Sequence, residues 1–261
     1  MNKVIKADCL DWMAKQKDDS FDFVFGSPPY AMKGDRYDCK QVRKWRPDEW
    51  VQWMMEVTEQ AVRISKGYVI WIVNGPVRGR RYFPVVEMLM TDWHRQGGWC
   101  ERPSIWTKNA PPNRQDWFRN DWEFAVAFKK PKSQPYFDWE AVAKPPKYSA
   151  GGHFRQRDSK GRRRRGGDYP QGKLARPSDV FRVVVGGGHM GSDLAHDNEA
   201  PFPERVAYRF VATCCPVKGK VLDPFVGSGT TLAVCKANGR NAVGLEIRDS
   251  QVDLSNRRLS E

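Results

Sequence analysis

The chain has 261 residues, of which 40% are hydrophobic, including 11 tryptophans and 13 phenylalanines, and this is enough to build the core of one large α/β domain. Its net charge of +13 favours a polyanionic partner; nucleic acid is favoured over a membrane, because no long basic amphipathic helix is evident. No apolar run is long enough to cross a bilayer and no signal peptide opens the sequence, so we expect a cytoplasmic protein. The six scattered cysteines include no CxxC pair, which argues against a disulfide framework or a zinc site.

The first 130 residues alternate short apolar runs with segments of helical periodicity. We predict strands at residues 4–7, 21–25, 68–73, 102–107 and 122–129. We predict helices at residues 11–17, from Pro47 to the Lys66-Gly67 stop, and at 84–96. Strand, helix and strand within about 25 residues is the rhythm of a parallel sheet with crossover helices.

The composition changes between residues 131 and 178. Residues 143–176 hold eleven basic and only two acidic side chains, so most of the excess positive charge of the chain lies here. Glycines make this segment flexible, and interleaved aromatic rings suit stacking on bases. We interpret it as a flexible target-recognition insertion that binds DNA; a solvated basic loop is the alternative. The predicted DNA-binding residues are Lys147, Arg155, Arg157, Lys160, Arg162, Arg163, Arg164 and Arg165.

Regular structure is predicted to resume after the insertion. We expect strands at residues 180–185, 221–222 and 241–245, and helices at 205–214, 232–238 and 250–259. The chain is thus divided into residues 1–130, the insertion 131–178, and residues 179–261, with the two outer segments forming two halves of one α/β domain.

The predicted strand at residues 21–25 ends in a turn with the sequence Ser27-Pro28-Pro29-Tyr30. Two consecutive prolines fix the backbone there, so a hydroxyl, the main-chain carbonyls and an aromatic ring are held rigidly. Because parallel sheets bind ligands at the carboxyl ends of their strands, this turn is a candidate active site. A plain Pro-Pro turn is the alternative.

A second turn, DPFVGSGTT, follows the predicted strand at residues 221–222. Glycines allow the backbone to approach a ligand closely, and an acid about twenty residues later, Glu246, is placed to hold ribose hydroxyls. The turn lacks the lysine of a phosphate-binding loop, and Leu232 replaces the third glycine of the dinucleotide fingerprint. A nucleoside without a diphosphate remains, and S-adenosylmethionine fits this description.

With SPPY far ahead of DPFVGSGTT, the chain resembles the DNA amino-methyltransferases, in the group whose catalytic motif precedes the cofactor motif. The resemblance covers nearly the whole chain. The segments that stand in the order of that group are SPPY, WEFAVAFKKP, PSDVFRV, HDNEAPFPERV, DPFVGSGTT and AVGLEIRDSQVDLSNRRL. It implies a Rossmann-like, S-adenosylmethionine-dependent methyltransferase fold in circularly permuted order: a mostly parallel seven-stranded sheet with helices on both faces, plus a basic insertion.

The resemblance also implies roles for individual residues. The positions that would line the methionine end of the cofactor are Asp223, Phe225, Gly227 and Gly229. Glu246 would hold the ribose, Asp8 would lie near the adenine, and Phe202 with Pro203 would hold the amino acid part. The cofactor site is completed by Pro224, Ser228, Thr230 and Thr231.

The predicted chemistry is transfer of a methyl group to an exocyclic amino group of a DNA base. Such an amine is a poor nucleophile because its lone pair is delocalised into the ring. Hydrogen bonds to the Ser27 hydroxyl and the Pro28 carbonyl would restore tetrahedral character at nitrogen, with Pro29 holding the turn rigid. Tyr30 would stack on a base that has been flipped out of the duplex.

The identity of the base depends on the first residue of the motif. In the family that the chain resembles, serine is commoner among enzymes that methylate cytosine at N4, and aspartate or asparagine among adenine-N6 enzymes, so Ser27 favours cytosine. Adenine-N6 methylation and a nucleic-acid-binding relative without catalysis remain open, as does methylation of RNA or protein, whose enzymes usually carry asparagine at this position. Methylation at cytosine C5 needs a nucleophilic cysteine in a Pro-Cys loop, whereas this chain has the reverse order at Cys215-Pro216. A restriction endonuclease acting on the same site would be an optional partner.

Overall fold

The computed structural model describes residues 2–33, 45–109, 118–146, 153–168 and 174–261, without the side chains of residues 153, 154, 167 and 168. The described chain divides into two compact units, Met1–Phe137 with Asp179–Glu261, and Asp138–Ser178. We call the first the catalytic unit and the second the insertion. Within the described ranges, no helix has both the length and the apolar character needed to cross a membrane.

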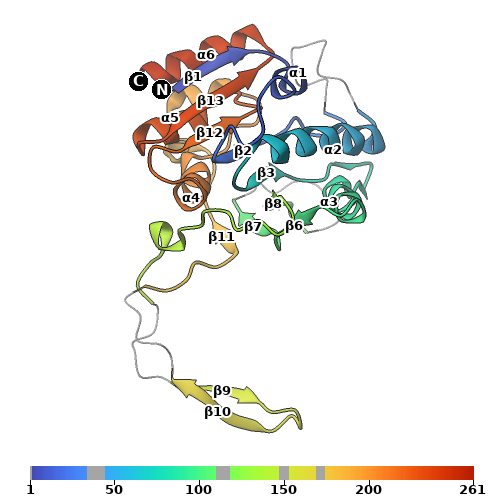
Figure 1. Ribbon diagram of the computed structural model, residues 1–261, viewed down its shortest axis with the longest axis vertical. Coiled ribbons are helices and arrows are strands. Elements are labelled where there is room, and N and C mark those ends of the chain that lie inside the picture. Colours follow the sequence, from blue (N-terminus) through green and yellow to red (C-terminus); the bar gives the residue numbers. More distant parts are fainter. Residues whose placement is uncertain (1, 34–44, 110–117, 147–152, 169–173) are drawn as a thin grey trace. The chain divides into compact units, whose positions relative to one another are not determined.

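The catalytic unit is built on one nine-stranded sheet (Figure 1). Its strands are β1 (Asn2–Lys6), β2 (Phe23–Gly26), β3 (Val69–Val73), β6 (Trp99–Cys100), β7 (Ser104–Thr107), β8 (Trp122–Lys129), β11 (Val180–Arg182), β12 (Lys220–Asp223) and β13 (Asn241–Glu246). Their order is β1-β13-β12-β2-β3-β8-β7-β11, with β6 also paired to β8. Only β8 runs against its neighbours in the sheet. The predicted mostly parallel sheet is therefore confirmed.

The sheet has more strands than the seven that were predicted. The additional pairings are β6 with β8 and β11 with β7. β6 has only two residues and was hidden in the sequence by the Gly97-Gly98 turn before it. The predicted strand at residues 180–185 is shortened to Val180–Arg182 and forms the edge of the sheet.

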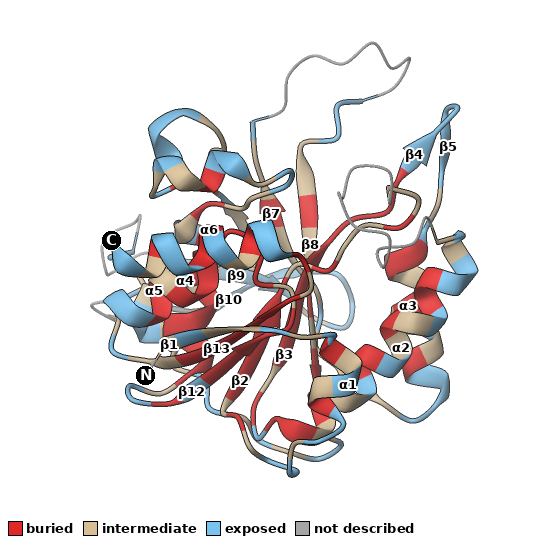
Figure 2. Cartoon of the chain, turned by 90° about the horizontal axis from the view of Figure 1, so that it is seen from above, coloured by how far each residue is buried: buried red, intermediate tan, exposed pale blue. Residues whose placement is uncertain are grey.

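Helices cover both faces of the sheet, as predicted. The helices are α1 (Cys9–Met13), α2 (Pro47–Ile64), α3 (Val85–Arg95), α4 (Glu204–Cys214), α5 (Thr230–Ala237) and α6 (Asp249–Ser260), with short 3-10 turns at Gly187–His189 and Asp193–Asp197. Figure 2 shows α1, α2 and α3 on one side of the strands and α4, α5 and α6 on the other. A parallel sheet needs this double cover because it buries both of its faces.

Alternation along the central strands divides the core between the two layers. Phe23 and Phe25 of β2 pack with the α4–α5 side, whereas Val24 packs with the α2–α3 side. In β3, Trp71 points to the α2–α3 layer and Ile70 and Ile72 point to the other. Successive strand side chains face opposite ways, so a continuous apolar run fills two cores.

The first helix begins two residues earlier than predicted. Asp8 is its N-cap, since the Asp8 carboxylate accepts hydrogen bonds from the backbone N–H of Leu10 at 2.9 Å and of Asp11 at 3.1 Å. An aspartate that follows a strand can therefore also start a helix. α5 likewise begins earlier than predicted, at Thr230, directly after Gly229.

The insertion contains regular structure that the sequence did not predict. It has a 3-10 turn at Trp139–Val142 and an antiparallel hairpin of β9 (His153–Arg157) and β10 (Arg163–Asp168). Asp158 starts the turn by accepting the N–H of Lys160 at 2.9 Å and of Arg162 at 3.0 Å, and Gly161 takes a φ of +74°. Turn chemistry at Asp158 and Gly161 accounts for this hairpin, and the flexibility of the insertion stays a prediction. Lys147 lies outside the described residues.

Gly26 lets β2 approach β12 closely. A Cβ atom at this position would lie 2.7 Å from Asp223 Oδ1, closer than such atoms normally come. We expect Gly26→Ala to lower the free energy of unfolding by about 1–3 kcal/mol, the usual cost of overpacking. Urea unfolding would measure this, with Gly188→Ala as the control because a Cβ there meets nothing within 4 Å. Equal unfolding midpoints for the two variants would contradict the prediction.

Candidate functional site

The two motifs meet because their strands are neighbours. β2 pairs in parallel with β12, with Leu222 opposite Val24, although almost the whole chain separates them in sequence. The turn Ser27–Tyr30 and the glycine-rich turn therefore leave the same edge of the sheet side by side. On the other flank of β12, β13 pairs with β1 and brings Glu246 beside Lys6, just before Asp8.

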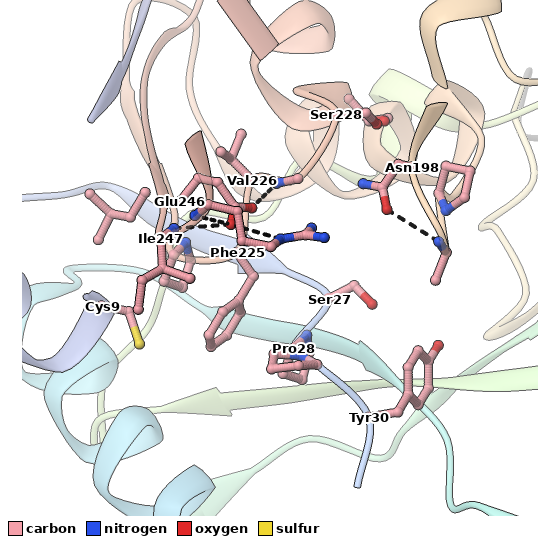
Figure 3. Close-up of a pocket in the computed structure, with 18 of the residues that line it drawn as sticks. Cys9, Ser27, Pro28, Tyr30, Asn198, Phe225, Val226, Ser228, Glu246 and Ile247 are labelled. Carbon is pink, nitrogen blue, oxygen red and sulfur yellow. Dashed lines mark hydrogen bonds and ion pairs between the residues drawn. The ribbon is translucent and has the colours of Figure 1, made fainter. Parts of the chain in front are cut away.

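A cavity of about 290 Å³ lies at this edge. Figure 3 shows side chains from both motifs pointing into it. The predicted residues that line it are Asp8, Ser27, Pro28, Pro29, Tyr30, Phe202, Pro224, Phe225, Gly227, Ser228, Thr230 and Glu246. One cavity thus joins the predicted catalytic turn to the predicted cofactor turn.

The catalytic turn is fixed by hydrogen bonds from both neighbouring layers. The Ser27 hydroxyl donates to the carbonyl of Ile72 in β3 at 2.9 Å, so its proton is directed away and its lone pairs are left to accept. The indole N–H of Trp50, in the first turn of α2, donates to the carbonyl of Pro29 at 2.7 Å. The sequence therefore stiffens the turn twice, by two prolines and by these two contacts.

Tyr30 is held by a buried carboxylate. Its hydroxyl donates to Glu123 of β8 at 2.7 Å, and Glu123, which is 7% exposed, also forms an ion pair with Lys108. The ammonium group of Lys33 lies 4.9 Å from the centre of the Tyr30 ring. A ring with its hydroxyl anchored in this way presents a fixed aromatic face at the cavity.

Aromatic rings form another part of the wall. Trp45 stacks on Trp53 of α2 with ring centres 4.6 Å apart, and Trp53 packs against Phe225 at 5.7 Å. Both tryptophans line the cavity. Tryptophans on an amphipathic helix usually face the core, so the helical periodicity of α2 alone does not predict that Trp53 lines a cavity.

Two glycines shape the turn after β12. Gly227 has a φ of +47° and Gly229 a φ of +84°, a region that favours glycine. A Cβ atom at Gly227 would collide with the side-chain amide of Asn198, which also lines the cavity. The turn therefore requires glycine for close approach as well as for conformation.

Glu246 closes the cavity floor at the end of β13. One carboxylate oxygen accepts the N–H of Gly227 at 3.2 Å, and the other accepts those of Ile247 and Arg248, both at 3.0 Å. The Arg248 guanidinium also bonds to Glu246 at 3.3 Å and to Glu199 at 2.7 Å. A carboxylate has about four lone-pair sites, so the oxygen bound only to Gly227 has room for a further donor.

Comparisons with known proteins decide the family. Residues 21–257 match the family model described as DNA methylase. The chain belongs to the DNA methylase family. It is 28% identical to the type II methyltransferase M.BglII of Bacillus subtilis over all of this chain and 69% of that protein, and 26% identical to M.ScaI of Streptomyces caespitosus over 97% of this chain and 79% of that protein.

Solved structures agree on the fold. The PvuII DNA methyltransferase, described as cytosine-N4-specific, matches with a TM-score of 0.73 and 14% identity over 99% of this chain and 86% of its own. The complex of M1.HpyAVI with S-adenosylmethionine matches with a TM-score of 0.58 and 17% identity over the whole of both chains. The predicted DNA amino-methyltransferase family and its Rossmann-like fold are confirmed.

Some predicted cofactor residues of this DNA methylase lie behind the cavity wall. Asp223, Pro203, Gly229 and Thr231 are not among the lining residues, and Asp223 is 1% exposed. The Asp223 carboxylate accepts the N–H of Phe225 at 2.9 Å and so shapes the turn from beneath. A direct contact between these four residues and a cofactor stays a prediction.

Sequence reasoning missed Arg258 of α6. It is 3% exposed, and its guanidinium donates to the hydroxyls of Ser228 at 3.3 Å and Thr230 at 2.8 Å, and to Glu204 of α4 at 2.7 Å. Arg258 thus links the glycine-rich turn to the start of α4, which follows Phe202 and Pro203. An arginine in the last turn of a terminal helix normally indicates a solvated residue, so the sequence carried no signal for this role.

Among the described residues of this DNA methylase, Cys9, Cys214 and Cys215 do not offer a nucleophile. Burial raises the pKa of Cys214 and Cys215 to about 12, and neither lines the cavity. Cys9 does line it, but burial also raises the pKa of Cys9 to about 12. A thiol with such a pKa is protonated at neutral pH and is a poor nucleophile, which agrees with the sequence argument against methylation at C5.

Asp223→Asn tests the effect of burial on stability. Burial raises the pKa of Asp223 from 3.8 to about 7. Between these two pH values the folded chain therefore keeps the proton of Asp223, whereas the unfolded chain releases it. The contribution of Asp223 to stability is therefore full below about pH 4 and is lost as the pH rises through about 7. The asparagine can still accept from Phe225.

Urea unfolding of both proteins from about pH 5 to 8 would measure this contribution. We expect the unfolding free energy of the wild type, relative to that of Asp223→Asn, to fall up to about pH 7 and then level off. A difference that does not change with pH would contradict the raised pKa.

Proposed function

We propose that this DNA methylase transfers a methyl group from S-adenosylmethionine to the N4 amino group of cytosine in duplex DNA, with the target base flipped out. The observation that carries the proposal is the single cavity in which Ser27 and Tyr30 face the turn Pro224–Ser228 and Glu246. An acceptor for the amine and a site for a nucleoside cofactor therefore share one space.

The lining residues fit S-adenosylmethionine. Ile247 offers apolar surface for the adenine, Phe225 remains the predicted neighbour of the methionine end, and the less occupied oxygen of Glu246 is available to the ribose hydroxyls. Gly227 allows close approach of the main chain, and Phe202 and Asp8 complete the wall. When bound, S-adenosylmethionine supplies an electrophilic methyl group on a sulfonium.

The chain itself then has to activate the amine. Because the Ser27 hydroxyl donates its proton in a hydrogen bond to the Ile72 carbonyl, its oxygen is oriented to accept a hydrogen bond from the amino group. The Pro28 carbonyl is the proposed second acceptor, since Trp50 already bonds to that of Pro29. Two acceptors pull nitrogen toward tetrahedral geometry and free its lone pair for in-line attack, which would form the nitrogen–methyl bond as the sulfur–methyl bond of the sulfonium breaks and would release one amino proton to solvent. The anchored Tyr30 ring offers a face on which the base can stack.

The β9–β10 hairpin supports DNA as the substrate. Its register places Arg155 opposite Arg165 and Arg157 opposite Arg163. Like charges directly opposite each other destabilise a hairpin, and a polyanion between them removes the repulsion. DNA binding by this hairpin is part of the proposal. A restriction endonuclease acting at the same site is suggested by the type II names of the relatives.

Ser27 is the reason to prefer cytosine, and adenine N6 is the alternative. The test is incubation of the purified chain with duplex DNA and S-adenosylmethionine, digestion to nucleosides, and mass spectrometry. N4-methyl-2′-deoxycytidine is the expected product, and N6-methyl-2′-deoxyadenosine would overturn the choice of base. Binding of DNA without any methyl transfer would instead identify a binding relative.

Ser27→Ala tests the catalytic turn. We expect methyl transfer to fall by about 10²–10³-fold, the usual effect of removing one polar group at the reacting centre, while the affinity for S-adenosylmethionine stays within about twofold. Single-turnover transfer and calorimetric binding would measure the two quantities. Ser133→Ala is the matched control, because its hydroxyl also donates to a main-chain carbonyl, at 2.7 Å from that of Lys130. An active Ser27→Ala variant would refute the mechanism.

A further inference from the structure

A short basic hairpin stands at the same edge of the sheet as the cavity. β4 (Val77–Arg78) pairs with β5 (Arg81–Tyr82) across the two-residue turn Gly79-Arg80, and both turn residues have a positive φ, +53° and +65°. This is the geometry of a tight type I′ turn, which matches the twist of the two strands. Figure 2 shows the hairpin as an exposed ribbon clear of the sheet, and all six of its residues are exposed.

The hairpin is tied to the catalytic turn. It follows the carboxyl end of β3, which is the neighbour of β2, and the Arg78 guanidinium donates to the carbonyl of Met32, two residues after Tyr30. Its base is also tightly packed, since a Cβ atom at Gly75 would lie 2.6 Å from the Tyr82 ring. The N–H of Phe83 donates to the carbonyl of Pro76 at 3.0 Å and closes the base. The hairpin is therefore a supported projection from the rim of the cavity.

Its three arginines give it a local positive charge. Within the described residues, no carboxylate forms an ion pair with Arg78 or Arg81. The Arg81 guanidinium lies 4.9 Å from the centre of the Phe83 ring, and the nearby carboxylate of Glu87 accepts instead from the Tyr82 hydroxyl at 2.9 Å. Arginines with fixed stems and no carboxylate partner suit bidentate binding of phosphate.

We propose that the β4–β5 hairpin binds the phosphate backbone of duplex DNA next to the base that enters the cavity. This inference rests on the proposed function, because it assumes a duplex at the catalytic turn. The hairpin is a second DNA contact, separate from β9–β10 and carried by the catalytic unit itself. The bond from Arg78 to Met32, two residues after Tyr30, places the base of the hairpin beside the turn that would receive the target base. Its contacts would read no sequence and would fix the position of the target nucleotide.

The test is the salt dependence of DNA binding by the full chain. The variant Arg80→Asn with Arg81→Gln removes two charges but keeps the bond from Arg78 to Met32, and asparagine tolerates the positive φ at position 80. Binding to a fluorescent duplex is measured over a range of salt in the presence of S-adenosylhomocysteine. The slope of log affinity against log salt is negative, and each lost phosphate contact reduces its magnitude by about 0.9. We therefore expect the magnitude of the slope to fall by about 1.8 in this variant.

The matched control is Lys15→Gln with Lys17→Gln. These exposed lysines carry the same charge but lie before the amino end of β2, at the edge of the sheet opposite the cavity. We expect this control to keep the slope of the wild type. Equal slopes for the hairpin variant and the control would overturn the inference, because only total charge would then matter.

Methyl transfer separates this inference from the proposed function. Failure of the wild type to methylate DNA refutes the proposed function, while the comparison of slopes still decides whether the hairpin binds DNA. If the wild type is active, we expect the hairpin variant to raise the KM for DNA at least tenfold, with its maximal rate within about twofold of the wild type, because the arginines do not touch the reacting atoms. A variant that lowers only the maximal rate would also contradict the inference.

Discussion

The parallel pairing of β2 with β12 is the constraint on which the site depends. It places two turns from opposite ends of the sequence at one edge, and it needs Gly26, because any side chain there would strike Asp223. Asp223 in turn holds the backbone of Phe225, which lines the cavity. A single close approach between two strands therefore fixes both where the cofactor turn begins and how far it lies from Ser27.

A second layer of contacts turns this adjacency into a rigid site. The Ile72 carbonyl in β3 accepts a hydrogen bond from the Ser27 hydroxyl, and the Trp50 indole in α2 donates one to the Pro29 carbonyl. The Glu123 carboxylate in β8 accepts one from the Tyr30 hydroxyl. Each of these three residues of the proposed catalytic turn is thus oriented by a different element of the sheet or its cover. Groups that are already oriented spend little free energy on reorganisation when the substrate arrives, which is the condition for effective electrostatic catalysis.

The sequence predicted much of this arrangement because its signals are local. The apolar runs of β2 and β3 and the prolines and glycines of the two turns depend only on neighbouring residues. What the sequence could not predict arises between elements distant in the chain. Arg258 reaches Ser228 and Thr230 only because α6 packs beside α5, and Trp53 reaches the cavity only because α2 lies over Phe225. The β9–β10 hairpin was missed because its charges dominate its composition and conceal its turn.

The distribution of charge connects the fold to its substrate. At the cavity wall, the Arg248 guanidinium is paired with the carboxylates of Glu246 and Glu199. The two hairpins differ from this: arginines face arginines across β9–β10, and among the described residues no carboxylate forms an ion pair with Arg78 or Arg81 of β4–β5. Unbalanced positive charge costs stability unless an anion is bound. If the proposed function is correct, these exposed arginines would hold phosphates while the base chemistry takes place in the cavity of the sheet.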